Sequence, residues 1–184
     1  GTRIHNSSPR ESIANGLAMV TEERRATGIF SILDVRSNTV ISCLKKCRSD
    51  KLPHLSNKKM QAKTQWSVDR MRIKTPSLST KIRSLSGGNQ QKAIIGRWLL
   101  TEPEIFLMDE PTRGIDVGAK YEIYQIIIDM AREGKSVIMV SSEMPELLGV
   151  CDRILVMSNG RLAGAVDAAS TTQEEIMTLA AKYV

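Results

Sequence analysis

Apolar and polar positions alternate most regularly in the second half of the chain, where they predict a succession of helices and strands. A helical pattern from about Asn89 to Leu100 precedes the apolar run "EIFLMDE", and the helical stretch "GAKYEIYQIIIDMAREG", which Gly134 would end, precedes the apolar run "SVIMVSS". Buried strands that alternate with helices are typical of a parallel sheet covered on both faces. The pattern therefore predicts an α/β fold, with its functional residues at the carboxyl ends of the strands.

The residues that follow "SVIMVSS" predict a smaller succession of elements. These are a short helix "MPELLGV", a hairpin "RILVMSNGRLAGAV" and an amphipathic helix "TTQEEIMTLAAKYV". We place the hairpin turn at Asn159-Gly160, because this dipeptide accepts the positive φ angles of a two-residue turn. Thr171 or Thr172 is expected to cap the last helix.

The first 40 residues predict a short helix and a short strand. Ser8 is a candidate N-cap, with Pro9 at the first helical position and Glu11 at the spacing of a capping box. Gly16 is expected to end this helix, and the apolar run "LAMV" after it predicts a buried strand.

The middle segment, residues 41–83, is strongly basic. Between Lys45 and Arg83 there are twelve Lys or Arg residues and two Asp, whereas the whole chain has a net charge of +6. Such a block is compatible with a solvated face, a membrane surface or nucleic acid. Trp66 is its only aromatic residue, so it lacks the stacking platform of single-strand binders. We expect a small helical subdomain with loops.

Length and composition narrow the class of protein further. A chain of 184 residues with 41% hydrophobic and 25% charged residues can build about one globular domain. No apolar run approaches the ~18 residues of a membrane span, and no signal pattern is present at Gly1. The three cysteines, Cys43, Cys47 and Cys151, indicate a reducing compartment and are interpreted as packing residues.

Two carboxylates end the first apolar run. Asp109 and Glu110 would be delivered to the carboxyl end of a buried strand, where an Asp can hold Mg²⁺ through water and a Glu can deprotonate an attacking water. Taken alone, this pattern is equally typical of a strand that ends in a solvated acidic turn.

A second motif, "SLSGGNQQK", places two glycines at the start of a helix. Exposed N–H groups and the helix dipole favour a phosphate at such a helix N-terminus. The sequence contains no G-x-x-x-x-G-K-[ST] loop, which usually holds the phosphates of a nucleotide. The motif therefore predicts a phosphate that another segment binds.

In combination, the ordered motifs "LSGGNQQK", "IFLMDE", "RGID" and "VSSEMPELL" resemble the signature motif, Walker B strand, D-loop and switch strand of ATP-binding cassette (ABC) ATPases. The resemblance implies a P-loop NTPase-like parallel-sheet core with a small helical subdomain, and places the phosphate-loop part of the cassette upstream of Gly1. Residues 1–40 would end the N-terminal core and hold the Q-loop. Residues 41–83 would face the membrane subunits, and residues 84–184 would carry the signature, Walker B, D-loop and switch motifs.

The chain most resembles the second nucleotide-binding domain of ABC monosaccharide importers, and among them those for galactose and methyl galactosides. The quoted stretches "KTQWSVDRMRIKTP" and "SSEMPELLGVCDRILVMSNG" carry this finer resemblance. It implies the C-terminal part of an ATP-hydrolysing subunit that uses ATP and Mg²⁺ at the cytoplasmic face of a bacterial inner membrane. The implied partners are another cassette, the N-terminal half of the same polypeptide, together with membrane-spanning permease subunits and, indirectly, a periplasmic sugar-binding protein.

The family assigns roles to the signature and D-loop residues. Ser86, Gly87 and Gly88 would meet the γ-phosphate of an ATP molecule held by the partner cassette, because in this family two cassettes pair head to tail. Bulkier side chains would hold the backbone away from that phosphate. Gln90 is a weaker candidate for a nucleotide contact, and Asp116 belongs to the D-loop.

The chain departs from the family at two positions of its own site. Glu22 stands where the Q-loop glutamine is expected, and Ser142 stands in place of the switch histidine. Asp109, as Mg²⁺ ligand, and Glu110, as catalytic residue, would therefore serve a weakened site, which implies an asymmetric ATPase. The isolated chain is predicted to be inactive, because a strand carrying the phosphate loop should pair with the Walker B strand.

Two alternatives remain open. The chain could be a regulatory nucleotide-binding half whose acids never catalyse. It could also belong to a nucleic-acid-linked ABC ATPase, although the 63 residues between Glu22 and Leu85 show no heptads of a long coiled coil. No nucleic-acid partner is expected.

Overall fold

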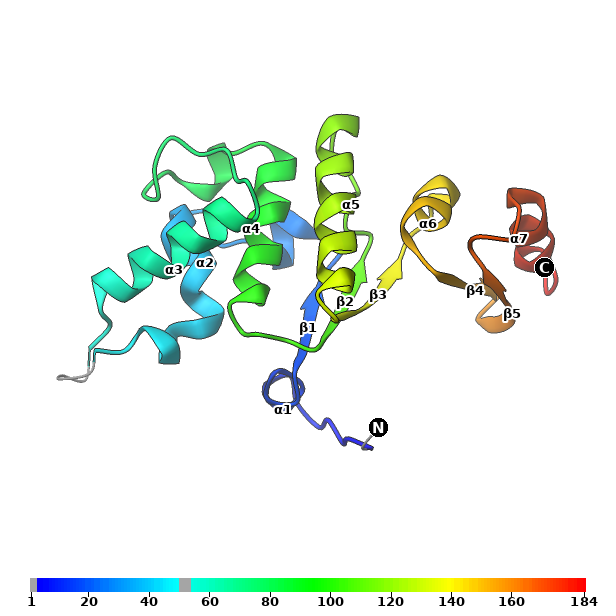
Figure 1. Cartoon of the computed structure of the whole chain (residues 1–184), viewed down its shortest axis with the longest axis horizontal. Coiled ribbons are helices and arrows are strands. Elements are labelled where there is room, and N and C mark those ends of the chain that lie inside the picture. Colours follow the sequence, from blue (N-terminus) through cyan, green and yellow to red (C-terminus); the bar gives the residue numbers. More distant parts are fainter. Residues whose placement is uncertain (1–2, 50–53) are drawn as a thin grey trace. The chain divides into compact units, whose positions relative to one another are not determined.

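The computed structural model of the chain describes residues 3–49 and 54–184, which form two compact units (Figure 1). The first unit is Gly1–Val140 and the second is Ser141–Val184. The three functional segments inferred from the sequence do not follow this division, and their boundaries stay predictions. Part of the basic block, residues 50–53, lies outside the described residues.

A three-stranded parallel sheet forms the centre of the first unit. Its strands are β1 (Leu17–Val20), β2 (Ile105–Asp109) and β3 (Ser136–Val140), in the order β1-β2-β3. The carboxyl ends of parallel strands meet at one edge, as predicted. The central place of β2 contradicts the expectation that a phosphate-loop strand pairs with it, because β1 and β3 already occupy both of its hydrogen-bonding edges.

The two faces of this sheet differ in burial. On one face the side chains of Ala18, Val20, Phe106 and Met108 are almost fully buried. On the other face Met19, Ile138 and Val140 are 48%, 58% and 56% exposed. The prediction of a sheet covered on both faces is therefore wrong for the described residues, because successive side chains of a strand point to opposite sides and only one side is packed.

The short elements at the N-terminus follow the sequence prediction. Helix α1 (Pro9–Ala14) is capped by Ser8, whose Oγ accepts a hydrogen bond from the Glu11 N–H at 3.3 Å. The Glu11 carboxylate returns to Ser7 rather than to the cap residue. Gly16 adopts a φ of +79° after the helix, as its predicted role requires.

The helical region begins earlier than residue 41. Helix α2 (Val35–Val40) continues into the 3₁₀ helix η2 (Ile41–Cys47), and α3 (Asn57–Arg70) and the short 3₁₀ turn η3 (Ile82–Ser84) follow. The predicted boundary thus falls inside a helical run, since no turn residue marks it. Helix α2, η2 and the residue that follows α4 (Gly87–Leu99) contribute four buried residues to a small core, against which Met60 of α3 packs: Val40, Cys43, Cys47 and Leu100. The packing role predicted for Cys43 and Cys47 is confirmed.

Two long helices, α4 (Gly87–Leu99) and α5 (Val117–Arg132), connect the helical region to the sheet (Figure 1). Helix α4 packs against α2, α3 and α5, and α5 also packs against β3. A Cβ atom added at Gly96 of α4 would lie 2.1 Å from Ser67 Oγ of α3, so α4 and α3 approach closely there. Gly134 ends the α5 segment with a φ of +86°, as predicted.

The second unit contains α6 (Met144–Val150), the hairpin β4 (Arg153–Ser158) and β5 (Arg161–Asp167), and α7 (Gln173–Ala180). Asn159 and Gly160 have φ angles of +44° and +75°, which confirms the predicted hairpin turn. Thr172, one of the two expected caps, accepts the Glu175 N–H. No helix among residues 3–49 and 54–184 is long and apolar enough to cross a membrane.

Candidate functional site

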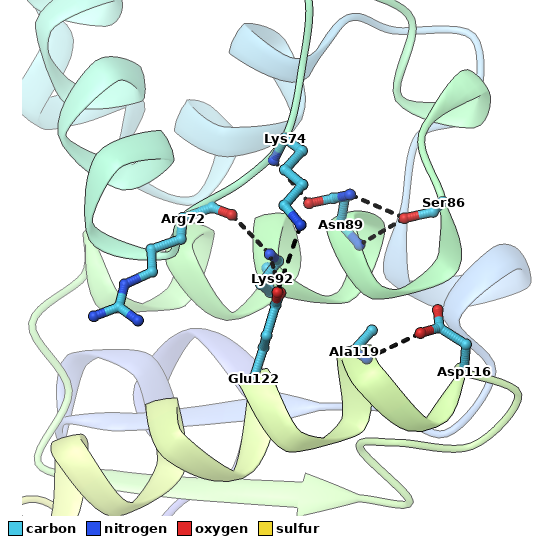
Figure 2. A network of polar contacts seen from close by, with 8 residues as sticks. All are labelled: Arg72, Lys74, Ser86, Asn89, Lys92, Asp116, Ala119 and Glu122. Atoms are coloured by element: carbon cyan, nitrogen blue, oxygen red, sulfur yellow. Dashed lines mark hydrogen bonds and ion pairs between the residues drawn. The ribbon is translucent and has the colours of Figure 1, made fainter.

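The glycine-rich motif forms the first turn of α4. The helix begins two residues before the predicted Asn89, because Ser86 is its N-cap, with φ −60° and ψ 158°. Ser86 Oγ accepts the Asn89 N–H at 3.5 Å and the Asn89 side-chain amide at 2.9 Å (Figure 2). Gly87 and Gly88 are the first two helical residues, and the N–H groups of a first turn have no partner within their helix.

Packing inside the chain requires glycine at position 88 and leaves little room beside position 87. A Cβ atom at Gly88 would lie 2.4 Å from Ala119 Cβ on α5. A Cβ atom at Gly87 would lie 3.0 Å from Arg24 Nη2 and 3.4 Å from the Gly114 carbonyl oxygen. The sequence analysis assigned the need for glycine to the phosphate, but at Gly88 packing against α5 is a second, intramolecular cause.

The Gln90 side chain is buried and hydrogen-bonded within the chain. Its side chain is 4% exposed, and its amide nitrogen donates to the carbonyl oxygens of Ile82 and Leu85 at 3.3 and 3.0 Å. Its Oε1 accepts from Arg24 Nε at 3.3 Å. Because the amide is turned into the loop before the motif, we remove Gln90 from the candidate nucleotide contacts.

Arg24 joins the segment after β1 to the signature helix and to the loop after β2. It opens the short π-helix η1 (Arg24–Gly28), and its Nη1 also donates to the Arg113 carbonyl at 3.4 Å. Partial burial lowers the pKa of the Arg24 guanidinium. The sequence analysis missed this residue, because nothing in "VTEERR" distinguishes one surface arginine from another.

Asp109 and Glu110 lie at the carboxyl edge of the sheet, as predicted. Asp109 is the last residue of β2 and pairs with Val140 of β3. The Glu110 N–H donates to the Val140 carbonyl at 2.9 Å, and the Glu110 carbonyl accepts the Arg113 N–H at 3.1 Å. Glu110 has a φ of +45°, a left-handed conformation that is uncommon for a side chain other than glycine. Such strained residues are concentrated at functional sites.

Two further candidates have intramolecular partners. The Glu22 carboxylate forms an ion pair with the Arg113 guanidinium, so the acid at the Q-loop position is neutralised locally. Asp116 is the N-cap of α5, and its carboxylate accepts the Ala119 N–H at 2.9 Å. The ion pair of Glu22 joins the segment after β1 to the loop after β2, whereas Asp116 caps its own helix.

Ser142 belongs to the second compact unit. Its neighbour Ser141 donates to the Glu146 carboxylate at the start of α6 and accepts the Glu143 N–H at 3.1 Å. The predicted place of Ser142 near a γ-phosphate stays a prediction.

Asp109 and Glu110 are the candidate ligands for a divalent metal. Within residues 3–49 and 54–184, no three His, Cys, Asp or Glu side chains are grouped as a metal site. Asp109 and the adjacent Glu110 nevertheless offer the hard carboxylate oxygens that Mg²⁺ prefers. This ion is commonly held by one or two carboxylates together with phosphate oxygens and water, so the two acids fit it.

Two buried cations on α4 also escaped the sequence analysis. Arg97 donates to the Asn38 carbonyl at 2.6 Å, to the Gly28 carbonyl at 2.7 Å and to Asn38 Oδ1 at 3.0 Å. Burial lowers the pKa of its guanidinium to about 10.

Lys92 is only 1% exposed and bonds to Arg72 and Glu122 (Figure 2). A lone Lys or Arg in a helical pattern gives no signal that it is buried.

The fold is that of known ABC cassettes. A nucleotide-free ATP-binding cassette from an ABC transporter superposes with a TM-score of 0.75 and 21% identity, covering 96% of this chain and 69% of that one. A dimeric post-hydrolysis state of an ATP-binding cassette bound to ADP and Pi gives a TM-score of 0.70 and 21% identity, covering 84% of this chain and 63% of that one.

Relatives of higher identity carry a more specific name. The galactose/methyl galactoside import ATP-binding protein MglA of Fusobacterium nucleatum is 65% identical over all 184 residues. The Pasteurella multocida protein of the same name is 63% identical over 98% of the chain. The chain spans 37% and 36% of the length of these two relatives. The expectation that it is the second, C-terminal cassette is not supported by these matches and is not carried forward.

The family itself is matched over more than half of the chain. The ABC transporter family aligns with residues 1–113, which include the signature turn at Ser86 and the acidic edge at Asp109 and Glu110. This match, the cassette fold and the relatives agree. The chain therefore belongs to the ABC transporter family.

Proposed function

We propose that this chain is part of the ATP-hydrolysing subunit of an importer for galactose and methyl galactosides. Its signature turn would complete a nucleotide site whose phosphates another cassette holds. The observation that carries the proposal is the N-terminus of α4, where Ser86 is the cap and Gly87 and Gly88 form the first helical turn. The names of the relatives above support the choice of substrate.

The signature turn would act as a preformed anion site. The Ser86 hydroxyl and the N–H groups of Gly87 and Gly88 would donate to the γ-phosphate, where negative charge is spread over oxygens during phosphoryl transfer. Donors fixed before reaction cost no reorganisation when the charge develops. The close packing of Gly88 against Ala119 of α5, together with the Ser86 cap, would hold the turn in place.

Asp109 and Glu110 would serve a nucleotide on this chain's own side. Asp109 would hold Mg²⁺ through water, and Glu110 would orient or deprotonate the attacking water. Bound Mg²⁺ supplies charge neutralisation for the phosphates. The Glu22–Arg113 ion pair and the serine at position 142 remove two polar groups that the family provides there, so this site is expected to turn over slowly.

The basic helical region would face the membrane partners. Residues 41–83 would dock on permease subunits at the cytoplasmic face of a bacterial inner membrane, and a periplasmic sugar-binding protein would act through those subunits. Each Lys or Arg near anionic headgroups contributes roughly 1 kcal/mol. A purely solvated basic face remains the alternative for this segment.

Mutation of the two half-sites tests the proposal. In the reconstituted transporter that contains this chain, Ser86→Arg should abolish galactose uptake and ATP hydrolysis, since it fills the γ-phosphate position. Glu110→Gln should leave a measurable fraction of both, because it affects only the weaker site. Loss of transport in Glu110→Gln with normal transport in Ser86→Arg would reverse the assignment.

A second candidate is a regulatory nucleotide-binding half that never hydrolyses ATP. The ion pair of Glu22 with Arg113 and the serine at position 142 favour a regulatory role for this chain's own site. We would disable the partner cassette's phosphate loop and measure single-turnover hydrolysis with and without Glu110→Gln. Hydrolysis that depends on Glu110 excludes the regulatory half, whereas nucleotide binding without hydrolysis supports it.

A further inference from the structure

A buried ammonium group lies in the signature helix. Lys92 is six residues after the N-cap Ser86, and its side chain is 1% exposed. Lys92 Nζ donates to the Arg72 carbonyl at 2.7 Å and to Glu122 Oε2 at 2.7 Å (Figure 2). Burying a charged group is unfavourable unless it is paired and hydrogen-bonded, and here both partners come from other elements.

The first partner belongs to the loop after α3. Arg72 has a φ of +51°, a conformation that a non-glycine residue adopts only when its surroundings impose it. Two residues later the Lys74 N–H donates to Asn89 Oδ1 at 2.8 Å, and the Asn89 amide donates to Ser86 Oγ at 2.9 Å. One loop therefore contacts α4 twice, at Lys92 and, through Asn89, at the signature serine.

The second partner belongs to the helix that follows the D-loop. Glu122 lies on α5, one turn beyond Ala119, which contacts Gly88, and two turns beyond the N-cap Asp116. The hydrogen bond from Lys92 is the main cause that lowers the pKa of the Glu122 carboxyl group. Helices α4 and α5 are thus joined by an ion pair as well as by close packing.

We propose that Lys92 is a positioning residue for ATP hydrolysis, which holds the signature turn in register with the D-loop helix through Glu122 and with the helical region through Arg72. The proposal rests on the proposed function of the signature turn. A positioning role can be told apart from a purely stabilising one. An apolar pair of similar volume can replace a buried ion pair without loss of stability, but it cannot reproduce the directional contacts of Lys92.

A charge-deletion cycle separates position from stability. Glu122→Leu leaves the Lys92 ammonium buried without its carboxylate and should lower the thermal unfolding midpoint. Lys92→Met/Glu122→Leu removes both charges and should restore that midpoint. The double variant should still show kcat for ATP reduced roughly tenfold or more, with KM for ATP changed less, because small displacements of positioning groups reduce the rate strongly. Glu122→Gln keeps a hydrogen-bond acceptor for Lys92, so its kcat should lie between that of Glu122→Leu and that of the wild type.

Lys74→Met is the matched control. Its ammonium lies 3.7 Å from the same Glu122 carboxylate but is 80% exposed, so kcat should change less than about twofold. If the double variant restores both the unfolding midpoint and kcat, Lys92 is only structural and the proposal fails.

An activity-independent measurement distinguishes this failure from a failure of the proposed function. Hydrogen exchange of the α4 backbone amides from Asn89 to Ala93 should accelerate at least tenfold in Lys92→Met/Glu122→Leu and remain unchanged in Lys74→Met. Unchanged exchange in the double variant overturns the positioning role, whatever the activity. Normal hydrolysis in Ser86→Arg would instead overturn the proposed function while leaving the exchange result interpretable.

Discussion

A Cβ atom added at Gly88 would lie 2.4 Å from Ala119 Cβ, a separation that unbonded carbon atoms do not tolerate. The second signature glycine therefore faces α5, and its missing side chain allows α4 and α5 to approach. This contact sets the position of the first turn of α4 relative to the D-loop. It also means that glycine at this position does not by itself report a bound phosphate.

We predict that Gly88→Ala destabilises the protein by about 1–3 kcal/mol, the usual effect of overpacking. Gly88→Ala/Ala119→Gly should recover most of this free energy of unfolding, less the ~1 kcal/mol that glycine costs within a helix. Urea unfolding measures both. ATP hydrolysis should recover with stability, because the added methyl group points at α5. Recovery of stability without activity would show that the phosphate, not packing, requires glycine at position 88.

The Ser67 hydroxyl, which faces Gly96 of α4, predicts a stabilising substitution. Ser67 Oγ is buried and has no hydrogen-bond partner among the described residues. Because a buried polar group without a partner carries a desolvation penalty, Ser67→Ala should raise the free energy of unfolding by about 1 kcal/mol. Ser77→Ala is a suitable control, since the Ser77 hydroxyl is exposed. A destabilised Ser67→Ala would show that the hydroxyl is bonded in solution.

The buried hydrogen bonds of the Arg97 guanidinium predict a large loss of stability when this residue is replaced. Arg97→Met would leave the carbonyl oxygens of Asn38 and Gly28 buried without their donor, and each unsatisfied group costs about 1–3 kcal/mol. Arg97→Lys should lose less stability than Arg97→Met but remain below the wild type, since an ammonium cannot reproduce the planar fork of donors. Urea unfolding gives the free energies. Equal stability of the lysine variant and the wild type would exclude a geometric role for the fork.

The Cys43 thiol predicts a fall in stability at alkaline pH. Burial, together with the neighbouring Cys47, raises the pKa of Cys43 from an ordinary value of 9.0 to about 11. Between these values the folded state keeps a proton that the unfolded state has released. Stability therefore decreases as pH rises from about 9 to about 11, by at most about 1.4 kcal/mol per pH unit.

Urea unfolding across this pH range, compared with Cys43→Ala, isolates the effect from lysine and tyrosine titration. The difference in free energy of unfolding between wild type and variant should shrink as pH rises. A constant difference would show that the thiol titrates alike in both states.

The sequence by itself determined the local elements. Ser8 and Thr172 cap the predicted helices, Asn159-Gly160 turns the predicted hairpin, and Asp109 and Glu110 end the predicted strand. Caps, tight turns and apolar runs depend on residues near one another in the chain, so their signals are readable without the fold. The ordered motifs likewise indicated the family, because their order is a property of the sequence.

Only the tertiary structure decided which side chains of these motifs meet other elements. It placed β2 between β1 and β3, buried Gln90 in the preceding loop, paired Glu22 with Arg113 and joined Lys92 to Glu122. Each of these contacts, apart from that of Gln90, links residues at least 30 positions apart. A polar or charged residue has the same local pattern whether it is solvated or buried, so its partner is fixed only when helices and strands pack.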